Sequence, residues 1–152
     1  MGSEMAESPK QIKVFLCFEP DLQVCAERVT QWPVTNADFT AYNGRVAAAC
    51  DSSAAETARQ AAGRQIQDAD VLICFIGSMQ QDPWILWELE TAKAAGKGLV
   101  GILLKDYVDP PAVMRFCGAI FISFKKDLVE RAVAFAVGEE RDLAEDYTLE
   151  DE

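Results

Sequence analysis

An unbroken run of six apolar residues, Val71–Ile76, is the feature that most limits what this 152-residue chain can fold into. The run stops at Gly77 and Ser78, which is typical of a strand buried on both faces, as in a parallel sheet. After a short polar turn, Asp82 and Pro83 have the form of an N-cap and the first residue of a helix. We therefore expect a buried strand, a turn at its carboxyl end and a helix that packs back on the sheet.

The same alternation of apolar runs and helical segments extends along the chain. Strands are predicted at residues 12–18, 37–42, 69–76, 98–104 and 119–124, and helices at 21–32, 54–67, 83–95 and 127–137. Strands that alternate with helices predict an α/β fold whose parallel sheet is covered on both faces. By analogy, we expect a flavodoxin-like three-layer sandwich with five parallel strands in the order 2-1-3-4-5.

Length and charge predict one folded domain at residues 11–138, because a half-hydrophobic chain of this size fills a single core. Residues 139–152 hold eight acids and one arginine, net −7 of the total −11. Such a segment cannot bury apolar surface, so we expect an acidic, disordered tail. Residues 1–10 are expected to be a disordered N-terminus that resembles the remnant of an expression tag.

Composition excludes several classes of function. The chain has no basic cluster for binding nucleic acid, no apolar run near the roughly 20 residues of a membrane span, and no targeting signal, so we expect a cytoplasmic protein. It has no histidine, which removes Ser-His-Asp triads, Cys-His pairs and histidine-based zinc sites. Its five cysteines are widely spaced; we expect Cys17 and Cys74 to be buried, reduced core residues and predict no metal site. Any catalysis must therefore depend on carboxylates.

Three nucleotide or phosphate motifs fail in their context. Residues 96–101 read Gly-Lys-Gly-Leu-Val-Gly, the dinucleotide fingerprint, but they end a predicted helix and enter a strand, the reverse of what the motif requires. No P-loop pattern is present. A phosphorelay receiver needs an aspartate after its third strand, where this chain has Gly77 and Ser78.

Glu88 is the carboxylate most suited to a site. It follows Trp84 by four residues, so both lie on one face of the predicted helix, near the strand ends where open α/β sheets bind ligands. A helical wheel places Ile85, Leu89 and Ala92 on the core stripe, with Trp84, Glu88 and Thr91 on a flank. We therefore expect Glu88 to be half-covered. The alternative interpretation is an ordinary flanking glutamate beside tryptophans that serve only in packing.

Three segments together resemble the TIR superfamily, in particular its short bacterial and archaeal branch, which includes the TIR proteins of Thoeris antiphage systems. They read KVFLCF at 13–18, DADVLICFIG at 68–77 and DPWILWELETAKAAGKGLVGILL at 82–104, and the similarity spans about residues 12–137. The most specific element is Trp-x-x-x-Glu-Leu. The resemblance implies that Glu88 is the catalytic residue for NAD cleavage, with Trp84 as the preceding aromatic residue. Cys17 departs from the serine common in relatives, and Glu19 and Pro20 depart from the usual polar-aromatic pair.

The implied activity is that of an NAD glycohydrolase or ADP-ribosyl cyclase, with NAD as substrate and no cofactor. A carboxylate can stabilise the oxocarbenium-like centre that forms when nicotinamide leaves the ribose. We expect Phe18, Tyr42 and Trp84 to offer ring surfaces to the substrate, and Ser78 to bond a ribose or phosphate. The product would be ADP-ribose or a cyclic ADP-ribose isomer, an antiphage signal for a separate effector.

A non-catalytic alternative is a TIR interaction module that assembles with other TIR domains. Residues 43–50, at the position of the family's assembly loop, carry one charge, Arg45, and favour neither possibility. A flavin-binding flavodoxin-like protein is a further alternative.

Overall fold

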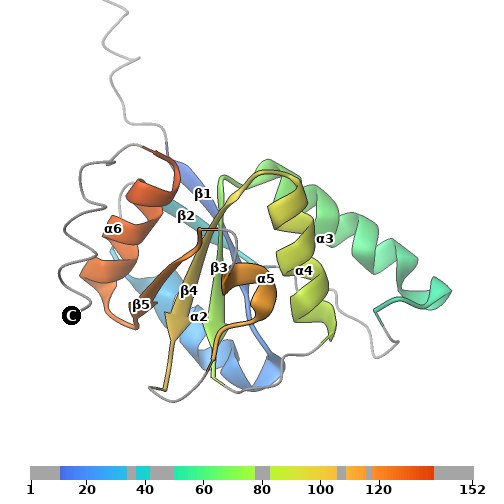
Figure 1. The fold of residues 1–152 in the computed structure, drawn as a ribbon, viewed down its shortest axis with the longest axis horizontal. Coiled ribbons are helices and arrows are strands. Elements are labelled where there is room, and N and C mark those ends of the chain that lie inside the picture. Colours follow the sequence, from blue (N-terminus) through green and yellow to red (C-terminus); the bar gives the residue numbers. More distant parts are fainter. Residues whose placement is uncertain are drawn as a thin grey trace, which may run out of the picture.

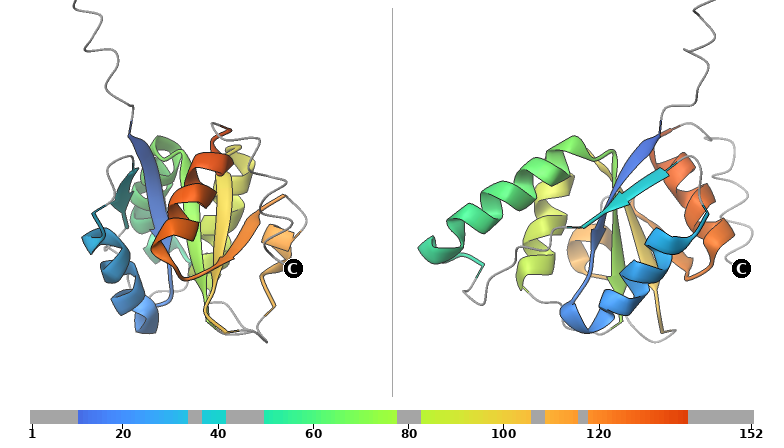
Figure 2. Two further views of the ribbon diagram at one scale, coloured as in Figure 1. Left: turned by 90° about the vertical axis from the view of Figure 1, so that its left-hand side faces the viewer. Right: turned by 180° about the vertical axis from the view of Figure 1, so that it is seen from behind.

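Five strands form one all-parallel sheet in the order β2-β1-β3-β4-β5, and helices cover both of its faces (Figure 1; Figure 2). The computed structural model describes residues 11–33, 37–41, 50–77, 83–105, 109–115 and 118–138. Every neighbouring pair of strands in the sheet is parallel. The α/β fold and the predicted strand order are therefore confirmed.

The strand and helix bounds agree with the predicted ranges to within two or three residues. The strands are β1 (Ile12–Cys17), β2 (Ala37–Thr40), β3 (Val71–Ile76), β4 (Gly98–Leu103) and β5 (Ile120–Ser123). The helical elements are η1 (Pro20–Leu22), α2 (Gln23–Gln31), η2 (Ser53–Ala55), α3 (Glu56–Asp68), α4 (Pro83–Ala94), α5 (Ala112–Arg115) and α6 (Lys126–Ala136). Only α5 was not expected; the amides of Met114 and Arg115 donate to the Pro111 carbonyl and close this single turn.

The sheet separates two apolar layers. All six residues of β3 are buried, as the continuous apolar run predicts. Side chains alternate along a strand, so those of Val14 and Leu16 pack under α2 and α6, whereas those of Phe15 and Cys17 pack under α3, α4 and α5. The helices that follow the strands therefore lie on opposite faces of the sheet (Figure 2).

The carboxyl end of α4 shows why the glycine-rich segment is no nucleotide motif. Gly96 has a φ of 75°. Its amide donates to the Lys93 carbonyl, and the Lys97 amide donates to the Ala92 carbonyl, both at 3.0 Å. This is a Schellman ending, in which glycine supplies the left-handed conformation. Residues 96–101 thus end a helix and enter β4, as predicted.

The predicted helix at 54–67 begins in the structure with the short 3-10 helix η2, which leads into α3. Ser52 occupies the N-cap position of η2, but its side chain forms no capping hydrogen bond. The guanidinium of Arg59 instead binds the carbonyls of Cys50 and Ser52, the latter at 2.8 Å. Arg59 therefore links α3 to the segment that precedes it. No helix in the described ranges is long and apolar enough to cross a membrane.

Candidate functional site

Helix α4 places Glu88 in the interior of the protein. Its buried residues are Trp84, Ile85, Glu88, Leu89 and Ala92. The expected core stripe is confirmed, but the prediction that Trp84 and Glu88 lie on a half-covered flank is wrong, since they are 5% and 0% exposed. The reason is that α4 packs against α3 as well as against β1, β3 and β4. Two partners in different directions bury a wider face than the single stripe of a surface helix.

Glu88 is unusual for its burial. Among the residues that the structure describes, it is the one polar or charged residue in the buried class, and its Oε2 atom is itself buried. The Cys17 thiol on β1, also 0% exposed, interacts with Glu88 and with the Cys74 thiol on β3, which is 0% exposed as well. We refer to Cys17, Cys74 and Glu88 as the carboxyl–thiol cluster. A carboxyl group is rarely buried so completely, because its charged form loses its hydration.

The register of the sheet brings the two thiols together. Cys17, the last residue of β1, is the direct partner of Cys74 in the middle of β3. The Sγ atom of Cys17 lies 4.0 Å from the Ile85 carbonyl oxygen, one helical turn before Glu88. The expectation that both cysteines are reduced core residues is therefore confirmed.

The Cys17 thiol stays protonated in this environment. Burial raises its pKa well above the ordinary value of 9.0, and hydrogen-bonding and charge interactions with Cys74 and then with Glu88 raise the pKa further. A neutral thiol is a weak hydrogen-bond donor, and an ionised carboxylate is an acceptor only. The hydrogen bond that the structure shows for this thiol is donated to the carbonyl oxygen of Ile85.

Trp84 borders the cluster on the side of α3. Its ring packs edge-to-face on Trp87, with centroids 5.9 Å apart and planes at 79°. The Trp84 side chain belongs to a separate small apolar cluster with Cys50, Ala55 and Ala58. Trp84 therefore links α4 to the segment that leads into α3. No local pattern indicates this contact, because Cys50 and η2 lie far from Trp84 along the chain.

The other predicted site residues are not gathered around Glu88 by the described structure. Phe18 directly follows β1 and is half-buried. Its side chain packs against the apolar layer under α2 and α6, on the opposite face of the sheet from Glu88. Tyr42, Ser78 and all of the predicted assembly loop at 43–50 except Cys50 lie outside the described residues. Their roles stay predictions.

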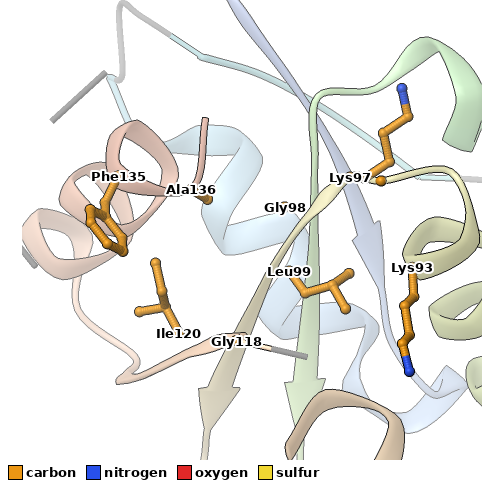
Figure 3. Close-up of a pocket in the computed structure, with 9 residues that line it drawn as sticks. Lys93, Lys97, Gly98, Leu99, Gly118, Ile120, Phe135 and Ala136 are labelled. Carbon is orange, nitrogen blue, oxygen red and sulfur yellow. The ribbon is translucent and has the colours of Figure 1, made fainter. Parts of the chain in front are cut away.

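Two cavities lined by described residues lie away from Glu88. The larger, of about 320 Å³, lies where α4 and α6 end and β4 and β5 begin; Figure 3 shows the apolar side chains of Leu99, Ile120 and Phe135 around it. The smaller, of about 190 Å³, is lined by Lys13, Asp38 and Asp68 among others. Both lie toward the amino ends of the strands, whereas open α/β sheets bind ligands at the carboxyl ends. Within the described ranges no group of acidic and cysteine residues has the arrangement of a metal site.

Comparison with known proteins identifies a family. Residues 15–109 match the family model of the Thoeris protein ThsB, TIR-like domain. Among curated protein sequences, none is significantly similar to the chain.

Solved structures share the fold at low sequence identity. A conserved protein from Enterococcus faecalis V583 aligns with a TM-score of 0.57 and 11% identity, over 82% of this chain and 98% of its own. A 2-desoxiribosyltransferase from Leishmania mexicana aligns with a TM-score of 0.54 and 17% identity, over 83% of this chain and 97% of its own. At such identities the likeness is one of fold.

Proposed function

This chain belongs to the family of the Thoeris protein ThsB, TIR-like domain, and from this premise we propose that it cleaves the nicotinamide–ribose bond of NAD, with Glu88 as the catalytic residue. Membership of this family supports the reaction class, and the burial of Glu88 supports its role as the catalytic residue. The product is ADP-ribose or a cyclic ADP-ribose isomer, which acts as an antiphage signal on a separate effector.

The burial of Glu88 is the observation that carries the proposal. Moving the charged carboxyl group of a glutamate from water into the protein interior costs on the order of several kcal/mol, unless interactions with other groups offset the lost hydration. Glu88 is 0% exposed, so its carboxyl group is expensive to retain for packing alone. Buried ionisable groups beside specific polar partners are typical of catalytic sites.

The chemistry requires one carboxylate and no histidine. When the bond between the ribose C1′ and the nicotinamide nitrogen breaks, the electron pair leaves with the nitrogen and nicotinamide departs as a neutral molecule. The positive charge that develops on the ribose is stabilised by the negative charge of Glu88, and a site of low polarity strengthens this attraction. Water then attacks C1′ to give ADP-ribose and a proton, or the adenine part of the same molecule attacks to give a cyclic isomer.

Access to the carboxylate requires a change of conformation. A side chain that is 0% exposed cannot touch a substrate, so part of the cover must move before the reaction. Trp84 is a candidate for this movement, because it lies one helical turn from Glu88 toward the start of α4, at the carboxyl ends of the strands. We expect self-association with other copies to favour the opened state, and activity to rise with protein concentration.

The test is an assay of the purified protein with NAD, at several protein concentrations, in which nicotinamide is measured by chromatography. Parallel samples contain 2′-deoxynucleosides, because the fold is also that of a 2-desoxiribosyltransferase. Release of nicotinamide supports the proposal. Release of a free base from nucleosides, with NAD intact, would assign a different glycosidic substrate.

The same samples are examined by sedimentation, which distinguishes the enzymatic proposal from the alternative that the protein is a non-catalytic interaction module. Assemblies that form without any consumption of NAD or nucleoside would reject the enzymatic proposal and favour a scaffold. A colourless protein solution, with no flavin absorbance, would dispose of the flavin-binding alternative.

A further inference from the structure

We infer that Arg59 is a positioning residue, which holds residues 50–55 against Trp84 and thereby restricts access to Glu88. We call residues 50–55 the strap. The strap matters for catalysis only if Glu88 is the catalytic residue, so this role of Arg59 rests on the proposed function. It identifies an interaction that keeps the site closed and a substitution that opens it.

Hydrogen bonds from the side chain of Arg59 link α3 to the strap. The Nη1 atom of Arg59 donates to the carbonyl oxygens of Cys50 and Ser52, the latter at 2.8 Å. Hydrogen bonds from a charged donor are stronger than those between neutral groups. Arg59 is half-buried, so water competes less for these bonds than for those of an exposed arginine. The first turn of α3 thus holds the strap that precedes it.

The strap also packs on Trp84. Cys50 and Ala55, at the two ends of the strap, form one small apolar cluster with Trp84 and with Ala58 of α3. All four residues are buried, including the large side chain of Trp84. The indole ring therefore loses part of its cover when the strap leaves α3.

Trp84 connects the strap to the catalytic carboxylate. It precedes Glu88 by four residues, so the two side chains are neighbours on one face of α4. Trp84 is the nearer of the two to the carboxyl ends of the strands, where open α/β sheets bind ligands. A substrate that approaches from that edge reaches Trp84 before it reaches Glu88. Arg59 therefore acts on the carboxylate through the strap and Trp84.

The local structure of the strap favours an opening that leaves the rest of the fold intact. The strap consists of a turn at residues 50–52 and the 3-10 helix η2, whose hydrogen-bond geometry is poorer than that of an α-helix. Its residues 51–54 are exposed or half-buried. Segments with little buried apolar surface open at a lower free energy than the core of a protein. Loss of the Arg59 hydrogen bonds should therefore release the strap while the sheet stays folded.

The experiment measures the alkylation rate of Cys50, a free cysteine of the strap that is 7% exposed. The purified proteins react with iodoacetamide at one fixed pH, and mass spectrometry of their peptides gives the rate at each cysteine. The wild type is compared with Arg59→Met and Arg59→Lys. Arg64→Met is the matched control, because Arg64 lies on the same helix and is exposed.

Arg59→Met should raise the alkylation rate of Cys50 by about tenfold or more, because hydrogen bonds from a charged donor are lost and the thiol reacts from the open strap. Arg59→Lys keeps the charge and a donor on a shorter side chain, so it should restore part of the protection. Arg64→Met should stay within about twofold of the wild type, as expected for a surface substitution. Equal rates at Cys50 in Arg59→Met and Arg64→Met would overturn the inference.

Cys74 distinguishes opening of the strap from a general loss of structure. It lies in the middle of β3 and is 0% exposed, so it reacts only when the sheet itself opens. Its alkylation rate should be the same in Arg59→Met as in the wild type. An equal rise at Cys50 and Cys74 would show that Arg59 only stabilises the fold, and would also overturn the inference.

The assay with NAD tests the connection to Glu88. At low protein concentration, Arg59→Met should release nicotinamide faster than the wild type, because a larger fraction of the protein has an open site. A residue that only supported the structure would lower this rate when replaced, so slower release in Arg59→Met would contradict its control of access. The alkylation needs no substrate. Absence of turnover in every variant, with the expected alkylation rates, would therefore reject the proposed function and still support Arg59 as the residue that holds the strap.

Discussion

The alkaline stability of the protein should depend on the thiol of Cys17. In the unfolded chain this thiol loses its proton near its ordinary pKa of 9.0, whereas in the folded protein burial keeps it protonated to a much higher pH. Above about pH 9 the unfolded state therefore binds fewer protons than the folded state, and the free energy of unfolding falls by about 1.4 kcal/mol per pH unit for this one group. Below pH 9 the contribution is constant.

The magnitude can be measured with a single substitution. Between about pH 8 and pH 10, the thiol alone should lower the free energy of unfolding by about 1.4 kcal/mol, and Cys17→Ala should lack this decrease. Urea denaturation under reducing conditions, followed by circular dichroism at each pH, gives the free energies. Comparing the change with pH, rather than the absolute stability, removes the packing cost of the substitution and the lysines and tyrosines common to both proteins. Identical pH dependence in the two proteins would refute the burial of Cys17 beside Glu88.

Two further predictions concern the sheet and the surface. An added Cβ at Gly101 would lie 2.7 Å from the ring of Phe121, so Gly101→Ala should destabilise the protein by about 1–3 kcal/mol, whereas Gly63→Ala, with its nearest atom at 3.9 Å, should be neutral or stabilising by up to about 1 kcal/mol. Equal changes in the free energy of unfolding for the two variants, measured by urea denaturation, would contradict the packing described around Gly101. The Lys13–Asp68 ion pair joins side chains that are 51% and 72% exposed, so Asp68→Asn should change the stability by about 0.5 kcal/mol or less, and a larger loss would contradict its surface character.

The fold could be predicted because its signals are local. The six apolar residues of β3 indicate a strand buried on both faces, and the alternation of such runs with helices indicates a parallel sheet. The end of α4 at Gly96 follows from the preference of glycine for positive φ. The single turn of α5 could not be predicted, since four residues are too few to show a helical period.

The site could be predicted only in part. The position of Glu88 on α4 follows from the pattern of the helix, but its complete burial does not. A helical wheel describes a residue relative to its own helix, whereas the burial of Glu88 depends on α3 and on Cys17, which are distant in sequence. The contact between Trp84 and Cys50 was missed for the same reason. Such contacts arise from tertiary packing between distant segments, which the periodicity of a single segment cannot predict.

Nicotinamide release by a matched pair of variants tests the central claim most directly. Glu88 is buried, whereas Glu90 lies on the same helix and is exposed. Glu88→Gln and Glu90→Gln make the same chemical change in these two environments. We predict that Glu90→Gln consumes NAD at the rate of the wild type and that Glu88→Gln loses at least about a hundredfold, as expected when a transition-state charge partner is removed. Equal rates in both variants, with an active wild type, would contradict the assignment of Glu88 as the catalytic residue.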